Sequence, residues 1–211
     1  MKLYGYFRSS ASYRLRIALN LKGLTVDTES VGLLDAAQLA AYRAVNPQGF
    51  VPALDTGEAL IPQSIAILEY LEELHPEPAL LPPDPAGRAF VRSVAQFVAC
   101  EIHPLNNLRV LKHLREIGQD KNAVDAWYRH WIADGFARLE AWLAASGRSG
   151  PFVAGAAPGI AECCIVPQIF NARRYACDLT PYPALVAIDA HCATLEAFQR
   201  AHPDRQPDAT P

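Results

Sequence analysis

The sequence lacks the features that would place it in several specialised classes of protein. No apolar run approaches the roughly 18 residues that cross a bilayer, and residues 1–6 lack the apolar core of a signal peptide. The 19 basic and 22 acidic side chains give a net charge of −3, too small to indicate a nucleic acid or a membrane surface as partner. The five cysteines include no Cys-x-x-Cys pair, and no group of His, Cys and acidic residues has metal-ligand spacing. We therefore expect reduced thiols, a cytoplasmic location and no metal site.

The composition that remains is typical of a folded globular protein, with 51% hydrophobic and 19% charged residues. A chain of 211 residues allows one large domain or two small ones. At this length folding buries about 70% of the surface of the unfolded chain, so stability does not require a disulfide or a metal ion.

Up to residue 76, short apolar runs alternate with amphipathic stretches. The short runs predict strands over residues 2–7, 25–31, 51–54 and 59–61. Apolar residues at helical spacing predict helices over residues 12–22, 35–45 and 64–74. This alternation favours an α/β layer built on one small sheet.

Residues 75–78 and 81–85 are rich in proline and cannot continue a helix. Beyond them the apolar spacing predicts only helices: a long one over residues 90–111 with a kink at Pro104, then helices over 127–143, 160–175 and 185–201. The predicted fold class is α/β plus all-α. We assign residues 1–76 to an α/β domain, 77–87 to a linker and 88–211 to a helical bundle.

The first predicted strand leads into a helix through Ser9, Ser10 and Ser12. A helix start carries unpaired N–H groups and a partial positive charge, which favour an anion such as a thiolate, and hydroxyls there can donate to that anion. The alternative is that one of these serines caps the helix. Thioredoxin-like oxidoreductases have Cys-x-x-Cys at this junction, and hydroxyls at the same spacing exclude a dithiol redox role. A thiolate that reacts here must arrive with a ligand.

Two arginines follow on the same predicted helix. Arg14 lies four residues after Ser10 and shares its face. Arg16 is about 200° away from Arg14 around the helix axis and serves a different surface. We expect one of the two to be structural.

Two further junctions carry residues suited to ligand binding. Val51-Pro52 begins a predicted strand, which indicates either an edge strand or a turn with a cis bond that directs the Val51 backbone toward a site. Gln63-Ser64 opens the third helix, where N–H groups and a hydroxyl could hold a carboxylate. The alternative is that Ser64 only caps that helix.

The helical part has three polar features. His103 and Asn107 are four residues apart on the predicted long helix and share a face, as a polar spot or as solvent-exposed residues. The pair formed by Arg174 and the preceding arginine is typical of a solvated face. Cys163 and Cys164 point to different sides of a helix and are typical of small buried hydrophobes.

Taken together, these residues resemble the zeta class of glutathione transferases, the maleylacetoacetate and maleylpyruvate isomerases. The Ser9-Ser10-Ala11-Ser12 motif is similar to the serine motif of that class. Two positions depart from the pattern, because Ala11 stands where cysteine or threonine is common and Gly159 replaces a hydroxyl cap. The resemblance runs nearly end to end, over segments 4–19, 46–47, 51–54, 63–72, 104–108, 166–168, 178–183 and 202–208.

The resemblance implies a thioredoxin-like glutathione-binding domain followed by an all-helical substrate-binding domain, with glutathione as cofactor and a symmetric homodimer as assembly. Ser9 would activate the glutathione sulfur with help from Ser10. The other implied glutathione contacts are the Val51 backbone at the cysteinyl part, Gln63 and Ser64 at the γ-glutamyl end, and His103 and Asn107 near the cleft.

The implied reaction is the cis–trans isomerisation of a maleyl keto-acid by reversible addition of the glutathione thiolate to the double bond. Arg8 and Arg174 would hold the substrate carboxylates, because a guanidinium binds a carboxylate through two parallel hydrogen bonds, and Arg109 would assist. Maleylacetoacetate is the substrate we expect, and maleylpyruvate is the alternative. A transferase that conjugates or dehalogenates small electrophiles such as α-haloacids, and a non-catalytic glutathione-binding protein, are the other functions left open.

Overall fold

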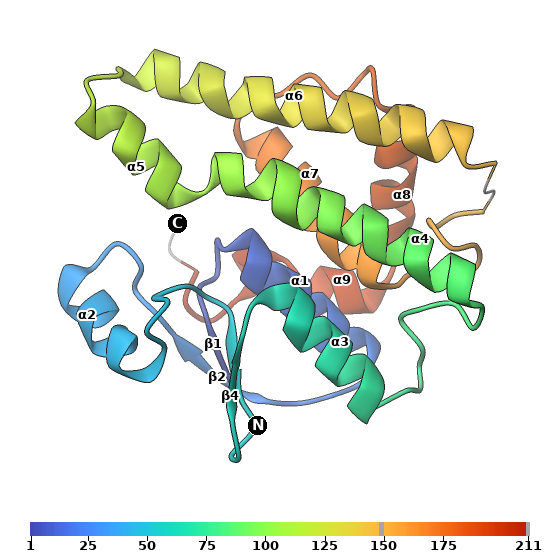
Figure 1. The fold of residues 1–211 in the computed structure, drawn as a ribbon, viewed down its shortest axis with the longest axis horizontal. Helices are drawn as coiled ribbons and strands as arrows, with labels where there is room; N and C mark the ends of the chain where they lie inside the picture. The colour runs from blue at the N-terminus through green and yellow to red at the C-terminus, as the bar shows by residue number, and fades with distance from the viewer. Residues whose placement is uncertain (148–149, 210–211) are drawn as a thin grey trace. The chain divides into compact units, whose positions relative to one another are not determined.

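A computed structural model describes residues 1–147 and 150–209 (Figure 1). The described chain forms two compact packing units. Unit 1 comprises Met1–Leu80 together with the chain from Ala193 onward, and unit 2 comprises Leu81–Cys192. These units differ from the boundaries assigned from the sequence, because the last part of the chain packs with the N-terminal segment. The final two residues of the predicted helical domain lie outside the described residues.

Unit 1 contains a four-stranded sheet with the strand order β2-β1-β3-β4. The sheet pairs β1 in parallel with β2, whereas β3 is antiparallel to β1 and to β4. All four predicted strands are present; the first three are shorter than predicted, and the last two end one residue later. The strands are β1 (Lys2–Gly5), β2 (Asp27–Ser30), β3 (Ala53–Asp55) and β4 (Leu60–Pro62).

The helices of unit 1 are α1 (Ser10–Leu21), α2 (Ala36–Val45), α3 (Ser64–Leu74) and α9 (Glu196–Ala201). Helices α1 and α3 pack side by side, and α9 packs on α1 (Figure 1). The α9 contact is polar as well as apolar, because Arg16 donates to the Ala201 carbonyl at 2.9 Å and Asn20 donates to the Ala197 carbonyl at 2.9 Å. The core of the unit holds fully buried aliphatic side chains, among them Leu3, Leu15, Ile17, Leu54, Ile67, Leu68 and Leu71.

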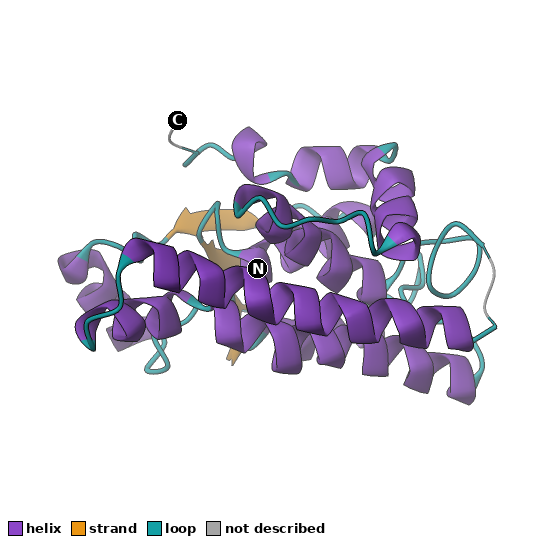
Figure 2. Cartoon of the chain, turned by 90° about the horizontal axis from the view of Figure 1, so that it is seen from above, coloured by secondary structure: helices purple, strands orange, loops and turns teal. Residues whose placement is uncertain are grey.

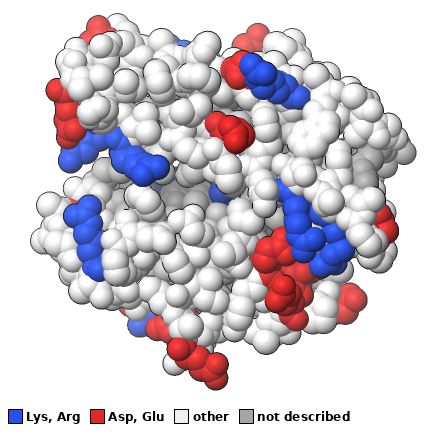
Figure 3. All heavy atoms as spheres, viewed as in Figure 1, with Lys and Arg blue, Asp and Glu red and all other residues white. Residues whose placement is uncertain are grey.

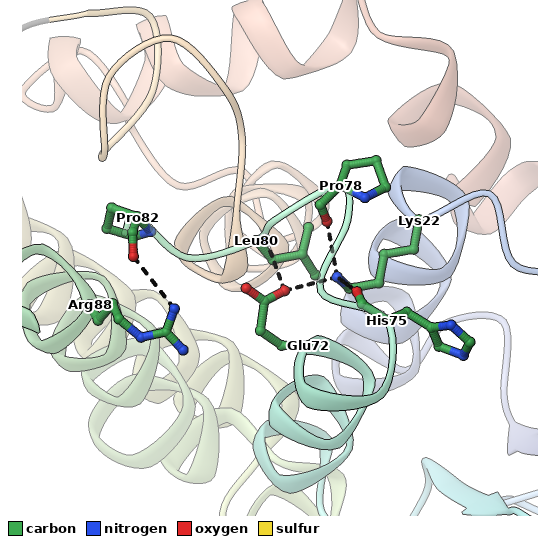
Figure 4. Close-up of polar contacts among 7 residues, drawn as sticks. All are labelled: Lys22, Glu72, His75, Pro78, Leu80, Pro82 and Arg88. Carbon is green, nitrogen blue, oxygen red and sulfur yellow. Dashed lines mark hydrogen bonds and ion pairs between the residues drawn. The ribbon is translucent and has the colours of Figure 1, made fainter. Parts of the chain in front are cut away.

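A buried ion pair ties the end of α1 to the segment after α3 (Figure 4). The Lys22 ammonium donates to Glu72 Oε2 at 2.8 Å, to the His75 carbonyl at 2.6 Å and to the Pro78 carbonyl at 2.9 Å. The same Glu72 oxygen accepts the Leu80 N–H at 2.9 Å. All three ammonium hydrogens therefore have acceptors, and the proline-rich segment is fixed by polar contacts rather than by regular structure.

Among its described residues, unit 2 has regular structure that is helical, apart from one isolated bridge between Phe152 and Gly155. Figures 1 and 2 show α6 running alongside the chain from α4 to α5. Its helices are α4 (Pro85–Gln96), α5 (Leu108–Glu116), α6 (Lys121–Ala145), α7 (Ile160–Arg174) and α8 (Pro183–Ala193). At the start of α7, the buried Glu162 carboxylate accepts the N–H groups of Gly159 and Val153, both at 2.7 Å. The Glu162 carboxylate thus satisfies N–H groups at the start of α7, where Gly159 has no side chain to cap the helix.

Two helices that the sequence predicts as continuous are each divided in the structure, so these two predictions are wrong. The predicted helix over residues 90–111 is two α-helices, because the chain passes through a π-helical turn (Phe97–Ile102) and a 3-10 turn (His103–Asn106) around Pro104. Proline lacks the N–H that a continuous helix requires. The predicted helix over residues 185–201 is also two, α8 and α9, since Leu195 is extended at φ −90° and ψ 130°.

Within the described residues, no helix is long and apolar enough to span a bilayer. In the same part of the chain no three His, Cys, Asp or Glu side chains are grouped as metal ligands. On the face drawn in Figure 3, basic and acidic side chains lie next to one another among uncharged ones, in keeping with the small net charge.

Candidate active site

The register of the sheet brings three separate segments to one end of it. Tyr4 in β1 pairs with Ala53 in β3, and Ala53 pairs with Pro62 in β4. The chain that leaves β1 toward Ser9 therefore lies beside the residues that enter β3, and the exit from β4 toward Gln63 lies at the same end. Three of the segments predicted to bind a ligand thus meet at one edge of unit 1.

Ser9 is the N-cap of α1. Its backbone is extended, with φ −68° and ψ 115°, and its hydroxyl oxygen accepts the Ser12 N–H at 3.2 Å. The capping alternative is thus confirmed for Ser9, but it does not compete with ligand binding. A hydroxyl has two acceptor sites and one hydrogen, so accepting the Ser12 N–H leaves the hydrogen for donation to an anion.

The surroundings of Ser9 favour negative charge. The first turn of α1 contains no acidic residue, so nothing on the helix offsets the positive end of its dipole. Ser10 is buried as the first residue of the helix, and Arg8 is exposed on the other side of Ser9. The Arg8 guanidinium lies 4.9 Å from the centre of the Phe7 ring, which supports its planar group.

The peptide bond between Val51 and Pro52 is cis, which confirms that alternative for this pair. Val51 itself is buried. Its backbone lies just outside the paired residues of β3, at the sheet end described above. A backbone that lies outside the strand ladder can offer an N–H and a C=O to a peptide-like ligand.

Gln63 occupies the N-cap position of α3 in a strained conformation, with φ 73° and ψ 115°. Its side chain is exposed and donates through Nε2 to Gln48 Oε1 at 2.7 Å. A residue other than glycine at positive φ costs about 1–3 kcal/mol and persists mostly at functional sites. The strain supports a ligand-binding role for the start of α3.

Ser64 does not cap α3, so that alternative is wrong. Its hydroxyl oxygen instead accepts Arg14 Nη1 at 2.9 Å, and both side chains are buried. Two other guanidinium nitrogens of Arg14, Nε and Nη2, have no hydrogen-bond partner within the described residues. With its oxygen accepting from Arg14, the Ser64 hydroxyl keeps its hydrogen for donation, and the buried positive charge favours an anionic acceptor there.

Arg14 is the functional candidate that sequence reasoning missed. Its spacing from Ser10 indicated a shared face of α1 but not its partner, since Ser64 lies 50 residues later. Arg16 serves a different surface, as predicted, donating to the Phe7 carbonyl at 3.0 Å and to the Ala201 carbonyl at 2.9 Å. Both arginines have structural contacts, and only Arg14 contacts a residue of the candidate site.

In unit 2, three candidates surround the break between α4 and α5. The half-buried His103 begins the 3-10 turn, and Asn107 caps α5 by accepting the Arg109 N–H at 3.1 Å. The prediction that His103 and Asn107 share a helix face is wrong, because Pro104 ends the helix between them. Arg109 is exposed in the first turn of α5.

Arg174 ends α7 over an aromatic platform. Its guanidinium lies 5.8 Å from the Phe170 ring centre and 6.0 Å from that of Tyr175. Tyr175 stacks on Tyr128 with 3.5 Å between ring centres, and burial raises the pKa of the Tyr128 phenol well above its usual value, so the platform stays uncharged. The neighbouring Arg173 differs, since its Nη1 forms an ion pair with Asp189 at 2.6 Å.

Cys163 and Cys164 are fully buried in α7, as predicted for small hydrophobes. Burial raises the pKa of the Cys163 thiol well above its usual value. A buried thiol that does not ionise is a poor nucleophile, so Cys163 is not suited to thiolate chemistry.

Comparison with known proteins finds relatives and solved structures that match almost the whole chain. Residues 3–79 match the model of the glutathione S-transferase N-terminal domain. The chain is 50% identical to a maleylpyruvate isomerase from Ralstonia sp, over 99% of this chain and 100% of the relative. A holo structure of a maleyl pyruvate isomerase, described as a bacterial glutathione S-transferase of the zeta class, has a TM-score of 0.96 and 49% identity, covering 100% of both chains.

A second solved structure adds the ligand. The maleylacetoacetate isomerase of Anaeromyxobacter dehalogenans 2CP-1, with GSH bound in its active site, has a TM-score of 0.89 and 48% identity. The comparison covers 99% of this chain and 97% of that one. The predicted fold class, an α/β glutathione-binding domain followed by helices, is confirmed by these likenesses. The chain belongs to the zeta class of the glutathione transferase family.

Proposed function

We propose that this chain is a glutathione-dependent cis–trans isomerase of a maleyl keto-acid. The observation that carries the proposal is the convergence of Ser9, Val51 and Gln63-Ser64 at one end of the sheet, with the buried charge of Arg14 held against Ser64. Relatives named maleylpyruvate and maleylacetoacetate isomerase match this chain over almost its full length, which supports the substrate class.

The residues of unit 1 fit glutathione. The carboxylate of its γ-glutamyl end suits the Ser64 hydroxyl and the Gln63 amide, with the Arg14 charge in support. Its cysteinyl amide suits the N–H and C=O groups of Val51, which lies outside the paired residues of β3. When bound, glutathione supplies a thiolate that adds reversibly to the cis double bond, so that the carbon–carbon bond can rotate before the trans bond forms.

Ser9 keeps that sulfur ionised. A free thiol has a pKa near 8.5, and lowering it by about two units makes the thiolate the main form at neutral pH. The Ser9 hydroxyl donates to the sulfur, and Ser10 and the N-terminus of α1 add positive potential. No buried general base is required.

The substrate carries two carboxylates, and we propose that Arg8 and Arg174 hold them while Arg109 assists. Each of these guanidinium groups is on the surface, and the two principal ones lie over aromatic rings that restrict their orientation. A restricted guanidinium loses less entropy when it binds a carboxylate. We assign His103 and Asn107 to the glutathione contacts, by the likeness of their segment to the family.

Replacing Arg174 by alanine is expected to lower kcat/KM for isomerisation about 10–100-fold, because a charge-assisted bond worth roughly 1.5–3 kcal/mol is lost. Arg174→Lys keeps the charge but not the planar fork and should recover part of the rate. Arg173→Ala is the matched control, since Arg173 is already paired with Asp189 and should leave kcat/KM unchanged. Equal rates for the Arg174→Ala variant and the parent would remove Arg174 from the substrate site.

The function is tested by supplying maleylacetoacetate and maleylpyruvate separately, with and without glutathione, and separating the products by chromatography. We expect trans product only with glutathione and no net loss of free thiol. A stoichiometric fall in free glutathione would instead show a conjugating or dehalogenating transferase. The two substrates differ by one methylene group, for which a binding pocket discriminates by about 10–200-fold, so their kcat/KM ratio identifies the preferred one.

We also propose that the protein is a cytoplasmic homodimer. A reducing compartment suits a chain whose five cysteines, all within the described residues, form no disulfide. Sedimentation at several protein concentrations, read against the 23.1 kDa mass of one chain, tests the assembly.

A further inference from the structure

The carboxylate of Asp208, close to the end of the chain, reaches back to the beginning of it. Asp208 Oδ2 accepts the Phe7 N–H at 3.1 Å, and the Ser30 hydroxyl donates to the same oxygen at 2.6 Å. One carboxylate thus joins the chain just beyond β1 to the end of β2. Phe7 and Asp208 are 201 residues apart in the sequence, and Ser30 and Asp208 are 178 apart.

Arg16 binds the carbonyl group of Phe7, the residue whose N–H donates to Asp208. Its guanidinium donates to the Phe7 carbonyl at 3.0 Å and to the Ala201 carbonyl at 2.9 Å, and it lies 5.2 Å from the Tyr13 ring centre. Burial lowers the pKa of Arg16 to about 10, partly offset by the charge of Asp208, so the group is still a cation at neutral pH. Both polar groups of Phe7 are therefore held by charged side chains.

These hydrogen bonds hold the backbone of Phe7 at a place where none of the described strands pairs with it. The ladder between β1 and its neighbours stops at Gly5, yet Phe7 is almost fully buried. A hollow of about 140 Å³ borders this turn, lined among others by Gly5, Ser12, Arg16 and Asp208. At its edge the Phe7 backbone is held by hydrogen bonds to Asp208 and Arg16. The next two residues are Arg8 and Ser9.

We propose that Asp208 is a positioning residue for the isomerisation, and that with Arg16 it fixes the turn that presents Arg8 and Ser9. The proposal rests on the function proposed above for Ser9. Ser9 is coupled to this turn through its own N–H, which donates to the Tyr6 carbonyl at 3.0 Å. Movement at Phe7 therefore moves the hydroxyl relative to the start of α1.

The test measures the pKa of glutathione bound to the whole protein, from its thiolate absorbance in the ultraviolet, together with kcat/KM. Asp208→Ala is expected to raise the pKa of the bound thiol by about one unit and to lower kcat/KM at neutral pH about tenfold. Asp208→Asn keeps an oxygen that can accept the Phe7 N–H and should recover part of both. Ser30→Ala removes the second contact of the carboxylate and should shift both measurements in the same direction by less.

Asp204→Ala is the matched control, because this exposed carboxylate lies in the same segment and forms an ion pair only with His202, at 3.6 Å, among the described side chains. It should change neither measurement. If Asp208→Ala and Ser30→Ala lower only the melting temperature, the contacts are merely structural and the proposal is overturned. If the parent protein binds glutathione without lowering the thiol pKa, the function proposed for Ser9 fails instead, which the parent alone reveals.

Discussion

Glu72→Gln is expected to lower the free energy of unfolding by about 3–5 kcal/mol, because it leaves the ammonium of Lys22 buried without its counter-charge. The Lys22 side chain is 0% exposed and that of Glu72 is 5% exposed, with 2.8 Å between Nζ and Oε2. Water cannot solvate the ammonium left behind, and the Leu80 N–H loses a charged acceptor. For a chain of this length the loss corresponds to a fall in melting temperature of about 10 °C.

Denaturant titration of Glu72→Gln, of Lys22→Met and of the variant that carries both measures the coupling between the two side chains. The double variant should recover only part of the loss, because the His75 and Pro78 carbonyls and the Leu80 N–H lose a partner as well. The exposed pair of Lys2 and Glu29, at 3.1 Å, is the control, and Glu29→Gln should lower the free energy of unfolding far less than Glu72→Gln does, because water solvates both groups. Equal costs for Glu72→Gln and Glu29→Gln would contradict the account.

Ser9→Gly is expected to lower kcat/KM about 10–100-fold while the fold is retained, because the donor to the sulfur is lost. Glycine is nearly as good an N-cap as serine and costs only a few tenths of a kcal/mol, whereas alanine costs about 1 kcal/mol. Glycine and alanine both lack the hydroxyl. The pair therefore separates the two roles of Ser9, since stability should follow the cap and activity should follow the hydroxyl.

The pH profile of kcat/KM shows the direction in which the pKa of the bound thiol moves in the Ser9 variants. In the parent, activity rises with pH as the bound thiol ionises and levels off above its lowered pKa. In both Ser9 variants that rise should move toward the free-thiol value near 8.5, so the loss is largest at and below neutral pH. Ser9→Gly activity equal to that of the parent at neutral pH, with an unshifted profile, would end the case for thiol activation by Ser9.

Much of the fold could be predicted because its signals are local. The apolar spacing around Ile67 and Leu71 predicts α3 with the bounds that the structure has, and the serines after the first strand predict the start of α1. Pro104 predicts a disturbance of the helix, but only the structure distinguishes a kink from a complete break. That choice depends on tertiary packing around the two turns, which no local pattern records.

The parts of the site that could not be predicted depend on contacts between distant residues. Arg14 and Ser64 are 50 residues apart, Lys22 and Glu72 are also 50 apart, and Phe7 and Asp208 are 201 apart. A buried arginine or lysine in a sequence resembles an exposed one until its partner is known. The candidate residues at helix starts were predictable, whereas the charged groups that support them were not.

The return of α9 and Asp208 to unit 1 has a consequence for synthesis on the ribosome. Domains that are continuous in sequence can fold as they emerge, beginning with the N-terminal one. Here Ala201, which accepts from Arg16, and Asp208, which accepts the Phe7 N–H, are translated after every residue of unit 2. The α/β layer therefore gains these contacts only after Ala201 and Asp208 are translated, and a product terminated after unit 2 would carry Ser9 and Ser64 without the segment that completes their scaffold.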